Sequence, residues 1–541
     1  MSVTPPADAA PHLRAHPPAP PVAGLRHRYR VPLLATLAAL PPYAVWWAFL
    51  ATGGGDLAAQ RAWADFAAQY GGSAYPLFWY GGTHTASYSV LSPYVMAAFG
   101  VRAVSVGSGL AATWLTALLL VRAGVRRPLG PALLAALTLW CDVAAGRTTF
   151  ALGVALGLAA CLHVTGERRP GLAAAYAALA PLASPLAGLF LAVVGAAFLA
   201  VRDRGSALAL LVPPAVAVAA TTALFPFTGE QPMPLPRLLP PVLLGSAVAA
   251  LVPRGWRVAR CSGAVYAAGA VLVHLVPSPV GTNVERLAGL FAAPVLLAAL
   301  AATPRRPLGR RTALGAALVF SVAWILPGTL ADQRVTAPVP AWASDTHGVV
   351  RALKGLGADR TRVEVVPAAS HREAALFAPH VHLARGWNRQ LDVERGRLFY
   401  DGTFSAAAYR AWLDRWAVGF VVLPSAAPER HAEAEAALLR EHRPRWLEPV
   451  WHDRHWHVYR VRDAVPLVSP PAVVLRTTGA ALEVRLPRPG TVTVRIAHSP
   501  WLRSDGGCLT RDGAFTRLTA AAPGEYRISS EYRLPRTGGT C

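Results

Sequence analysis

Two stretches decide the fold class: VPLLATLAALPPYAVWWAFL (residues 31–50) and ALALLVPPAVAVAATTAL (residues 207–224). Each is an apolar run of about the 20 residues that a helix needs to cross a bilayer. The whole chain of 541 residues agrees, because 54% of its residues are hydrophobic and only 15% are charged. Soluble domains usually carry about 25% charged residues. We therefore expect an α-helical protein that crosses a membrane several times, and we exclude a soluble or wholly disordered chain.

Similar apolar runs continue to residue 328 and predict about eleven membrane-spanning helices. Two of these spans are short, because Arg202 lies only 33 positions after Arg169, and a re-entrant pair is the alternative there. The predicted spans are residues 31–52, 101–122, 128–145, 149–166, 170–184, 185–201, 206–225, 236–253, 261–277, 284–303 and 312–328.

The net charge of +23 comes almost entirely from arginine, and Lys354 is the single lysine. Of the 23 arginines before residue 328, 18 fall on one side of the membrane if the spans are as predicted. Cytoplasmic loops are enriched in Lys and Arg, so we expect the N-terminus in the cytoplasm and the C-terminal region outside the plasma membrane. The positive charge is thus an orientation signal and does not indicate a nucleic-acid partner. The preference for Arg, with much Ala, Gly and Pro, is typical of a GC-rich, actinobacterial genome.

The chain divides into four parts. Residues 1–30 are rich in Pro and Ala and predict a disordered cytoplasmic tail. Residues 31–328 are the transmembrane domain. Residues 329–465 alternate between helical and strand patterns and predict an extracytoplasmic α/β domain. Residues 466–541 contain short strands separated by Pro, Gly and Asp, which favours a β-sandwich.

Five cysteines are present in the chain. Three lie in apolar spans, where small buried side chains are the ordinary interpretation. Cys508 and Cys541 lie in the region expected outside the membrane, where oxidation is permitted, and we predict a disulfide between them. No Cys/His spacing resembles a zinc site, so no metal site is predicted from these residues.

The first outer loop, residues 53–100, is long for a connection and is therefore a candidate functional segment. DLAAQRAWADFAAQY (residues 56–70) predicts an amphipathic helix whose apolar side chains lie on the membrane surface. YPLFWYGGTHTASYSVLSPYVMAAFG (residues 75–100) is dense in aromatic residues, as expected of a segment at the membrane interface.

This loop resembles the corresponding loop of the GT-C superfamily, the multi-span glycosyltransferases that use polyprenyl-phosphate sugars. The resemblance covers most of the chain. It extends to AAGRTTFALGVALGLAA (144–160), PLASPLAGLFLA (181–192), PVGTNVERLAGLFAAP (279–294), ARGWNRQLD (384–392) and the ending SPW…GGC…PGEYRISSEYRL. It implies an inverting transfer of a sugar from a polyprenyl-phosphate donor to a cell-envelope glycan or lipid. Some members also bind a divalent cation, so such an ion is a possible cofactor. Many members have paired acidic residues where this chain has Asp56 between Gly55 and Leu57.

Asp56 occupies the position of the family's catalytic base, which would deprotonate the acceptor hydroxyl. The alternative is a helix N-cap, since Asp after Gly caps a helix well. Few other charged residues are expected on the outer face, and ionisable groups near a bilayer are site candidates. Asp142 and Arg147 flank a short outer turn and would bind substrate or form a local ion pair. Glu285 and Arg286 open a span, where Arg286 would bind the lipid phosphate or pair with Glu285.

Further candidates come from the aromatic loop and the C-terminal region. His84 would hydrogen-bond a sugar hydroxyl, or is a structural histidine. Arg385, Trp387, Arg389 and Asp392 form a polar and aromatic cluster in the sequence. The cluster would line the cleft above the membrane, with Arg385 and Trp387 as substrate-binding residues, or would pack between the two outer domains.

Several classes of enzyme have no support, because the sequence contains no P-loop, Rossmann fingerprint, HExxH or GxSxG motif. Two other functions remain open. A multi-pass transporter fits the number of spans, although no internal repeat is evident. A non-catalytic GT-C-like scaffold of envelope assembly fits the absence of the acidic pair.

Overall fold

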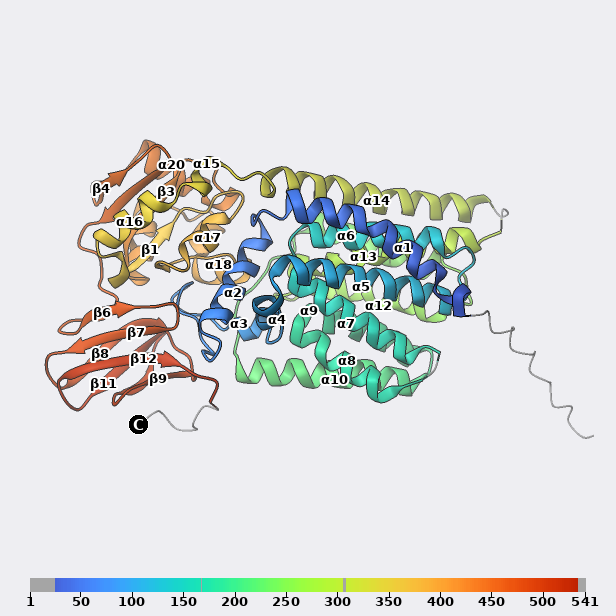
Figure 1. Cartoon of the computed structure of the whole chain (residues 1–541), viewed down its shortest axis with the longest axis horizontal. Coiled ribbons are helices and arrows are strands. Elements are labelled where there is room, and N and C mark those ends of the chain that lie inside the picture. Colours follow the sequence, from blue (N-terminus) through green and yellow to red (C-terminus); the bar gives the residue numbers. More distant parts are fainter. Residues whose placement is uncertain (1–24, 167, 305–307, 534–541) are drawn as a thin grey trace, which may run out of the picture.

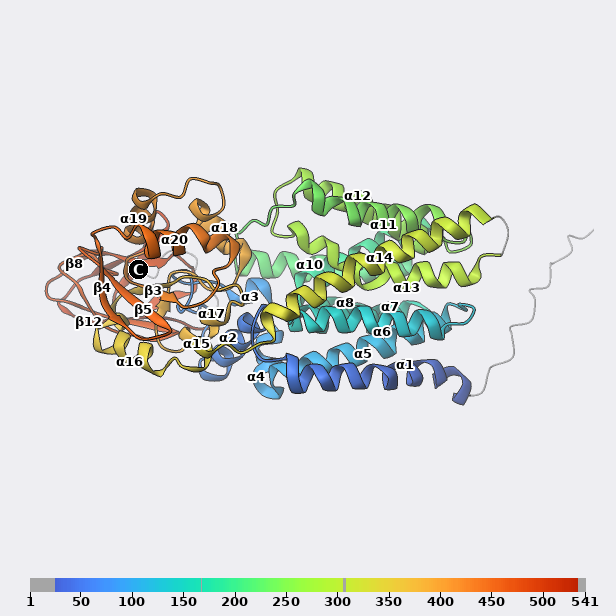
Figure 2. The same ribbon diagram turned by 90° about the horizontal axis from the view of Figure 1, so that it is seen from above.

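The computed structural model describes residues 25–166, 168–304 and 308–533. The structure consists of two bodies that lie end to end: a bundle of long helices, and a region of sheets with shorter helices (Figures 1 and 2). We call the first body the helical bundle, which comprises α1 and α5–α14. We call the second body the C-terminal region, and the long loop between α1 and α5 lies at the junction of the two (Figure 1).

Within the described ranges, six helices are long and apolar enough to cross a membrane, and five shorter apolar helices lie among them. The chain is therefore a multi-pass membrane protein. Each predicted span coincides with one of these helices, whereas complete crossing by the five shorter ones stays a prediction. The bundle consists of α1 (Leu25–Val45, continued by a π-helical turn at Trp46–Leu50), α5 (Val101–Arg122), α6 (Leu129–Ala144), α7 (Thr148–Val164), α8 (Pro170–Ala183), α9 (Pro185–Ala200), α10 (Arg204–Leu224), α11 (Leu235–Leu251), α12 (Arg257–Leu275), α13 (Glu285–Ala302) and α14 (Leu308–Thr336).

At the end of the bundle remote from the C-terminal region (Figure 1), arginines bind the ends of neighbouring helices: Arg122 donates to the carbonyl oxygen of Leu162, and Arg310 donates to that of Leu251. Such bonds satisfy the free carbonyls at helix C-termini. The charge pattern thus located one end of the bundle correctly, and the cytoplasmic assignment of that end stays a prediction.

The last bundle helix is longer than predicted. The sequence suggests an end at residue 328, after Pro327, but α14 continues through Asp332 to Thr336. Arg372 then binds its end by donating to the carbonyl oxygens of Thr336 and, at the end of the first helix, Thr52, at 2.6 and 2.8 Å. The bundle and the C-terminal region are therefore joined by direct hydrogen bonds.

The long loop is folded against the C-terminal region and contains α2 (Asp56–Gln69), α3 (Thr85–Tyr88) and α4 (Ser92–Phe99). The predicted helix at residues 56–70 is present, but its expected place on the membrane surface is wrong. Its apolar residues Leu57, Trp63, Ala64 and Ala67 are buried inside the protein. The apolar face of α2 packs against protein and not against lipid, because α2 lies between α4 and α17 (Arg372–Phe377).

The first part of the aromatic segment is interior and not interfacial, because Phe78, Trp79 and Tyr80 belong to a hydrophobic core shared with the C-terminal region. Tyr94 and Phe99, near the end of the segment, are exposed, and an interfacial position stays a prediction for them. The segment hydrogen-bonds along the edge of β2 (His382–Leu383), since Leu383 N–H donates to the Phe78 carbonyl and Tyr80 N–H donates to the Leu383 carbonyl. The loop thus covers a sheet edge that would otherwise be open.

The C-terminal region begins with a mixed five-stranded sheet of order β2-β1-β3-β5-β4, in which β1 pairs in parallel with β2 and β3. The alternation of helices and strands predicted for residues 329–465 is present in this part of the chain. Besides β2, this part contains α15 (Ala341–Ser344), α16 (His347–Gly355), β1 (Arg362–Val365), α18 (Arg389–Arg395), α19 (Ala406–Arg415), β3 (Val418–Pro424), α20 (Glu433–Glu441), β4 (Leu447–His452) and β5 (Trp456–Val461).

Two antiparallel sheets follow, of orders β10-β11-β8 and β6-β7-β12-β9, and both contribute to one apolar cluster. Cys541 lies outside the described residues, and with it the predicted Cys508–Cys541 disulfide. The strands are β6 (Val473–Thr477), β7 (Ala481–Leu486), β8 (Gly490–Ala497), β9 (Leu502–Ser504), β10 (Cys508–Asp512), β11 (Phe515–Ala520) and β12 (Gly524–Ser530).

Candidate active site at the junction of bundle and C-terminal region

A polar cavity of about 450 Å³ lies where the bundle meets the C-terminal region. The cavity is lined on the bundle side by α2, the α6–α7 turn, α13 and α14, and on the side of the C-terminal region by residues 387–390. Six of the eight predicted catalytic and substrate-binding residues line it: Asp56, Asp142, Arg147, Glu285, Arg286 and Trp387. Residues singled out from distant segments of the sequence therefore meet at one cavity, while the roles of the residues stay predictions.

Asp56 is the first residue of α2, and the capping position before it is occupied by Gly55 with φ +63°. Its side chain forms no capping bond. Instead, Oδ1 accepts a hydrogen bond of 3.1 Å from the indole N–H of Trp387, and Oδ2 lies 3.8 Å from Nε of Arg147. The carboxylate faces the cavity, about one third exposed. This geometry favours the site interpretation of Asp56 over the helix cap.

Arg147 lies between two carboxylates. Its Nη1 donates to Oδ1 of Asp142 at 3.1 Å, while its Nε faces Asp56. The local ion pair considered from the sequence is therefore present, and it forms part of the cavity wall. Asp142 is almost fully buried, and its ion pair with Arg147 therefore fixes the guanidinium beside Asp56.

Glu285 is paired with Arg237 and not with its neighbour Arg286. Two parallel hydrogen bonds of 2.7 Å join the carboxylate of Glu285 to Nε and Nη2 of Arg237, the strong bidentate arrangement. Arg286 contacts the ring of Phe150, 5.2 Å from its centroid, and has no carboxylate partner within the described residues. Its charge is available to an anion in the cavity.

Several cavity residues were not predicted. Asp332 was missed because the last span was ended too early, although the polar run ADQRVT after Leu330 was a possible signal. Gln333 donates to the carbonyl oxygen of Ala144 at 2.7 Å and so fixes this part of α14 beside the α6–α7 turn. The lining also includes the polar or aromatic residues Gln60, Trp63, Tyr88, Gln231, Asn283, Trp324, Asn388 and Gln390.

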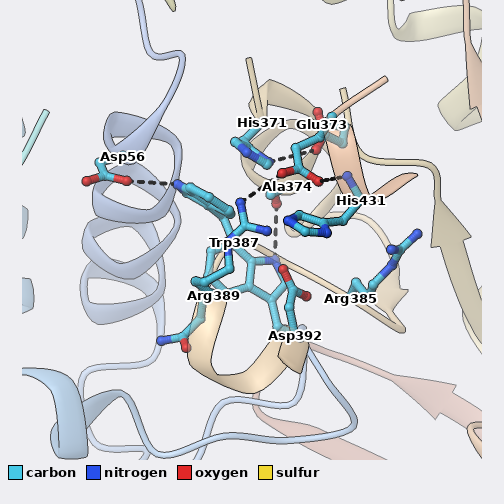
Figure 3. Close-up of polar contacts among 12 residues, drawn as sticks. Asp56, His371, Glu373, Ala374, Arg385, Trp387, Arg389, Asp392 and His431 are labelled. Carbon is cyan, nitrogen blue, oxygen red and sulfur yellow. Dashed lines mark hydrogen bonds and ion pairs between the residues drawn. The ribbon is translucent and has the colours of Figure 1, made fainter. Parts of the chain in front are cut away.

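The cluster at residues 385–392 is divided between the cavity and the protein interior. Trp387 and Arg389 line the cavity, and Arg389 pairs with Glu429 at 2.9 Å. Asp392 accepts a bond of 2.8 Å from the Tyr80 hydroxyl, and burial raises the pKa of its carboxyl to about 6. Figure 3 shows Trp387 between α2 and the loop that carries His371.

The structure does not bring Arg385 or His84 to the cavity. Arg385 is buried in the α/β part, where it binds Glu364 at 2.5 Å and also contacts Glu435. A buried guanidinium needs such partners, which explains its polar setting without a substrate. His84 packs against Tyr75 and Phe225, and burial lowers its pKa to about 4. It matches the alternative interpretation of a structural histidine.

An apolar groove of about 570 Å³ adjoins the polar cavity. It runs between α9 and α10 and is lined there by Leu189, Leu211, Pro214, Val218 and other apolar residues. Cavity and groove share four residues: Tyr88, Asn283, Arg286 and Gln390. The unpartnered guanidinium of Arg286 therefore lies at the boundary between a polar and an apolar compartment.

No group of three or more His, Cys, Asp or Glu side chains in the described ranges is arranged to hold a metal ion. Two of the cavity acids are instead engaged with arginines, in the pairs Glu285–Arg237 and Asp142–Arg147. The described residues thus contain no such cluster for the divalent cation that the family resemblance allows.

The fold and the site define a multi-pass membrane protein with a charged cavity under a C-terminal region of sheets. No protein-family model and no curated protein matches the chain. Among solved structures, the chain is similar to arabinofuranosyltransferase AftD from Mycobacteria, with 13% identity and a TM-score of 0.42 over 95% of this chain and 57% of that one. A mutant of the same protein matches with 13% identity and a TM-score of 0.41 over 95% of this chain and 60% of that one.

The chain thus spans about 60% of the length of the solved chains that it matches. These solved chains are glycosyltransferases by name.

Proposed function

We propose that the protein is a membrane glycosyltransferase that moves a sugar from a polyprenyl-phosphate donor to a cell-envelope glycan or lipid on the outer face of the plasma membrane. The observation that carries the proposal is the junction of two compartments at Arg286. The apolar groove suits a polyprenyl chain, the guanidinium suits its phosphate, and the polar cavity suits a sugar.

In this proposal Asp56 is the general base. It takes the proton of the acceptor hydroxyl while the oxygen of that hydroxyl bonds to the anomeric carbon of the donor sugar. The bond from the anomeric carbon to the phosphate oxygen breaks, and polyprenyl phosphate leaves with the bonding electrons. Attack opposite the leaving group inverts the anomeric centre. Arg286 stabilises the charge that develops on the phosphate.

The electrostatics of the cavity support this assignment. Asp56 is bonded through Oδ1 to a neutral donor, the indole of Trp387, while Oδ2 lies beyond hydrogen-bond distance of Arg147. One oxygen atom therefore remains open to an acceptor hydroxyl. Glu285 is fully engaged by Arg237 and is less suited to be the base.

The test is sugar transfer by the purified protein in membranes that contain an acceptor pool. The probes are radiolabelled polyprenyl-phosphate-linked arabinofuranose, mannose and glucose. We expect transfer from one of these donors by the wild-type protein and a loss of about a hundredfold or more in Asp56→Asn, as for removal of a general base. Asp65→Asn, on the same helix but outside the cavity lining, is the matched control.

Unchanged transfer by Asp56→Asn would contradict the assignment of the base. A wild-type protein that transfers none of the three sugars would contradict the proposed function and favour a scaffold or a transporter.

A further inference from the structure

The carboxylate of Asp56 is held by a residue of the C-terminal region. The indole N–H of Trp387 donates to its Oδ1 at 3.1 Å, across 331 positions of the sequence. A hydrogen bond to a charged group is stronger than one between neutral groups. The orientation of Asp56 toward the cavity therefore depends on where the indole ring of Trp387 lies.

His371 contacts the face of this indole ring. The two rings are nearly parallel, at 12°, with centroids 3.4 Å apart (Figure 3). The guanidinium of Arg389 lies 5.1 Å from the centroid of the Trp387 ring. With His371 stacked on the ring and the Arg389 guanidinium close to it, Trp387 is suited to act through its N–H group at the ring edge and not as a platform for a sugar.

His371 is itself fixed in place. Its backbone has φ +52°, a conformation in which His and Asn are favoured over most other residues. The preceding residue, Ser370, accepts a 2.7 Å hydrogen bond from the N–H of Gly55, next to Asp56. The loop with His371 and the start of α2 with Asp56 are thus parts of one hydrogen-bonded frame.

The imidazole of His371 is neutral in this setting. Its Nδ1 atom has no hydrogen-bond partner in the part of the chain that the structure describes, and it lies 3.9 Å from Oε1 of Glu373. Burial lowers the pKa of His371 well below the usual range, and the charges of Arg389 and Arg385 lower it further. A neutral ring packs against Trp387 without the cost of a buried charge.

The backbone behind Trp387 is equally constrained. A Cβ atom at Gly386 would lie 2.3 Å from Cδ2 of Trp79, so this position accepts no side chain. Trp79 is anchored by its own N–H bond of 3.2 Å to the carbonyl oxygen of Ala374. Trp387 is therefore supported from its backbone as well as from its ring.

We propose that His371 is a positioning residue: by stacking on Trp387 it holds the indole N–H on the carboxylate of Asp56, so that the C-terminal region sets the geometry of the base. This inference rests on the proposed function. Catalytic groups need supporting residues that fix their orientation to within about half an ångström, and the His371–Trp387 stack provides that support here.

A double-mutant cycle tests the proposal on the full-length protein, with sugar transfer as the readout. Trp387→Phe keeps a flat ring and removes the N–H group. His371→Asn keeps a residue that tolerates positive φ and removes the ring. We expect kcat to fall about tenfold in Trp387→Phe and about three- to tenfold in His371→Asn, with the donor KM little changed.

The double variant decides the matter. If His371 acts through the N–H group of Trp387, its loss adds nothing once that group is gone, and kcat of the double variant equals that of Trp387→Phe. If the two losses multiply, or if Trp387→Phe keeps wild-type kcat, the proposal is wrong. Trp456→Phe is the matched control, since it removes another buried indole bond, to the Asp345 carbonyl, outside the cavity lining.

A second readout separates this inference from the proposed function. In protein labelled with 5-fluorotryptophan, the fluorine NMR signal of Trp387 is the one absent from Trp387→Phe. We expect that signal to move in both Asp56→Asn and His371→Asn. A signal that moves in neither variant would overturn the positioning role, even if the wild-type protein transferred no sugar.

Discussion

Arg286 differs from the other arginines of the cavity in having no carboxylate partner within the described ranges. Arg147, Arg237 and Arg389 each pair with an acid at 2.7–3.1 Å. Arg286→Gln should therefore weaken binding of a long-chain polyprenyl phosphate about tenfold or more, because a hydrogen-bonded charge is lost. Arg286→Lys should bind with intermediate affinity, since it keeps the charge but not the bidentate geometry.

Thermophoresis of the detergent-solubilised protein with that lipid measures this effect. Arg334→Gln is the control, because Arg334 is exposed near the end of α14 and is absent from the cavity lining. Equal affinities of Arg286→Gln and the wild-type protein would remove Arg286 from the phosphate site.

Glu373 makes stability depend on pH. Burial raises the pKa of its carboxyl from the usual range to about 8. The folded state thus binds this proton more tightly than the unfolded state, whose pKa is about 4.3. The contribution of Glu373 to stability is full below about pH 4.3 and is lost as the pH rises through about 8, by at most about 1.4 kcal/mol per pH unit.

The glutamine in Glu373→Gln has no carboxyl group, so it neither binds nor releases a proton in this pH range. The melting temperature of this variant should therefore rise relative to that of the wild-type protein as the pH increases from 5 to 8, as measured by scanning fluorimetry. Glu433→Gln, an exposed carboxylate on α20, should follow the wild-type curve. Parallel curves for Glu373→Gln and the wild-type protein would show that Glu373 is ionised in the folded state.

The positions of the helices were predicted better than the contacts that their apolar faces make. Apolar runs located each bundle helix, because burial in a bilayer and burial in a protein demand the same side chains. For the same reason, the apolar face of α2 was assigned to the membrane surface, although Trp63 and Ala64 pack inside the protein. The apolar pattern of a helix shows that one of its faces is covered. It does not show whether lipid or protein covers that face.

Arg372 shows how the elements at the junction are joined. Its guanidinium donates to three carbonyl oxygens: those of Thr52, Thr336 and Pro338. Arg372→Met leaves these acceptors without their donor, which should cost on the order of 2 kcal/mol and lower the melting temperature. Proteolysis between residues 337 and 340 should become faster as the two bodies separate.

Arg351→Met is the matched control, because Arg351 is exposed on α16 and exposed substitutions usually change stability by less than about 0.5 kcal/mol. If Arg372→Met and the control have the same melting temperature, the junction is held by packing and not by this arginine.

At the scale of the molecule, the candidate site was predictable in part. Scarcity of charge singled out Asp56, Asp142, Arg147, Glu285 and Arg286, because an ionisable group beside a bilayer needs a reason to be there. The clustering of polar and aromatic residues in the sequence misplaced Arg385, since the interior of a globular domain also keeps charges in pairs. The groove was not predictable, because nothing in an apolar helix shows which of its faces borders an empty space.

The groove gives the molecule-scale prediction. If it holds the polyprenyl chain, a bulky side chain in it must compete with the lipid tail and not with the phosphate. Ala215 lines the groove and is exposed, so Ala215→Trp fills space without disturbing the core. Val216→Trp is the control, because Val216 is 62% exposed on the same helix and is absent from the groove lining.

Affinity should then depend on chain length. Each buried CH₂ group contributes about 0.8 kcal/mol, so displacement of even two or three groups should weaken binding of a long-chain polyprenyl phosphate by about tenfold or more. Binding of a two-isoprene phosphate, whose tail ends near Arg286, should change little in Ala215→Trp, and Val216→Trp should bind both lipids normally. Equal weakening of both lipids by Ala215→Trp would place the tail elsewhere, because an obstacle in the groove can affect only the part of the donor that reaches it.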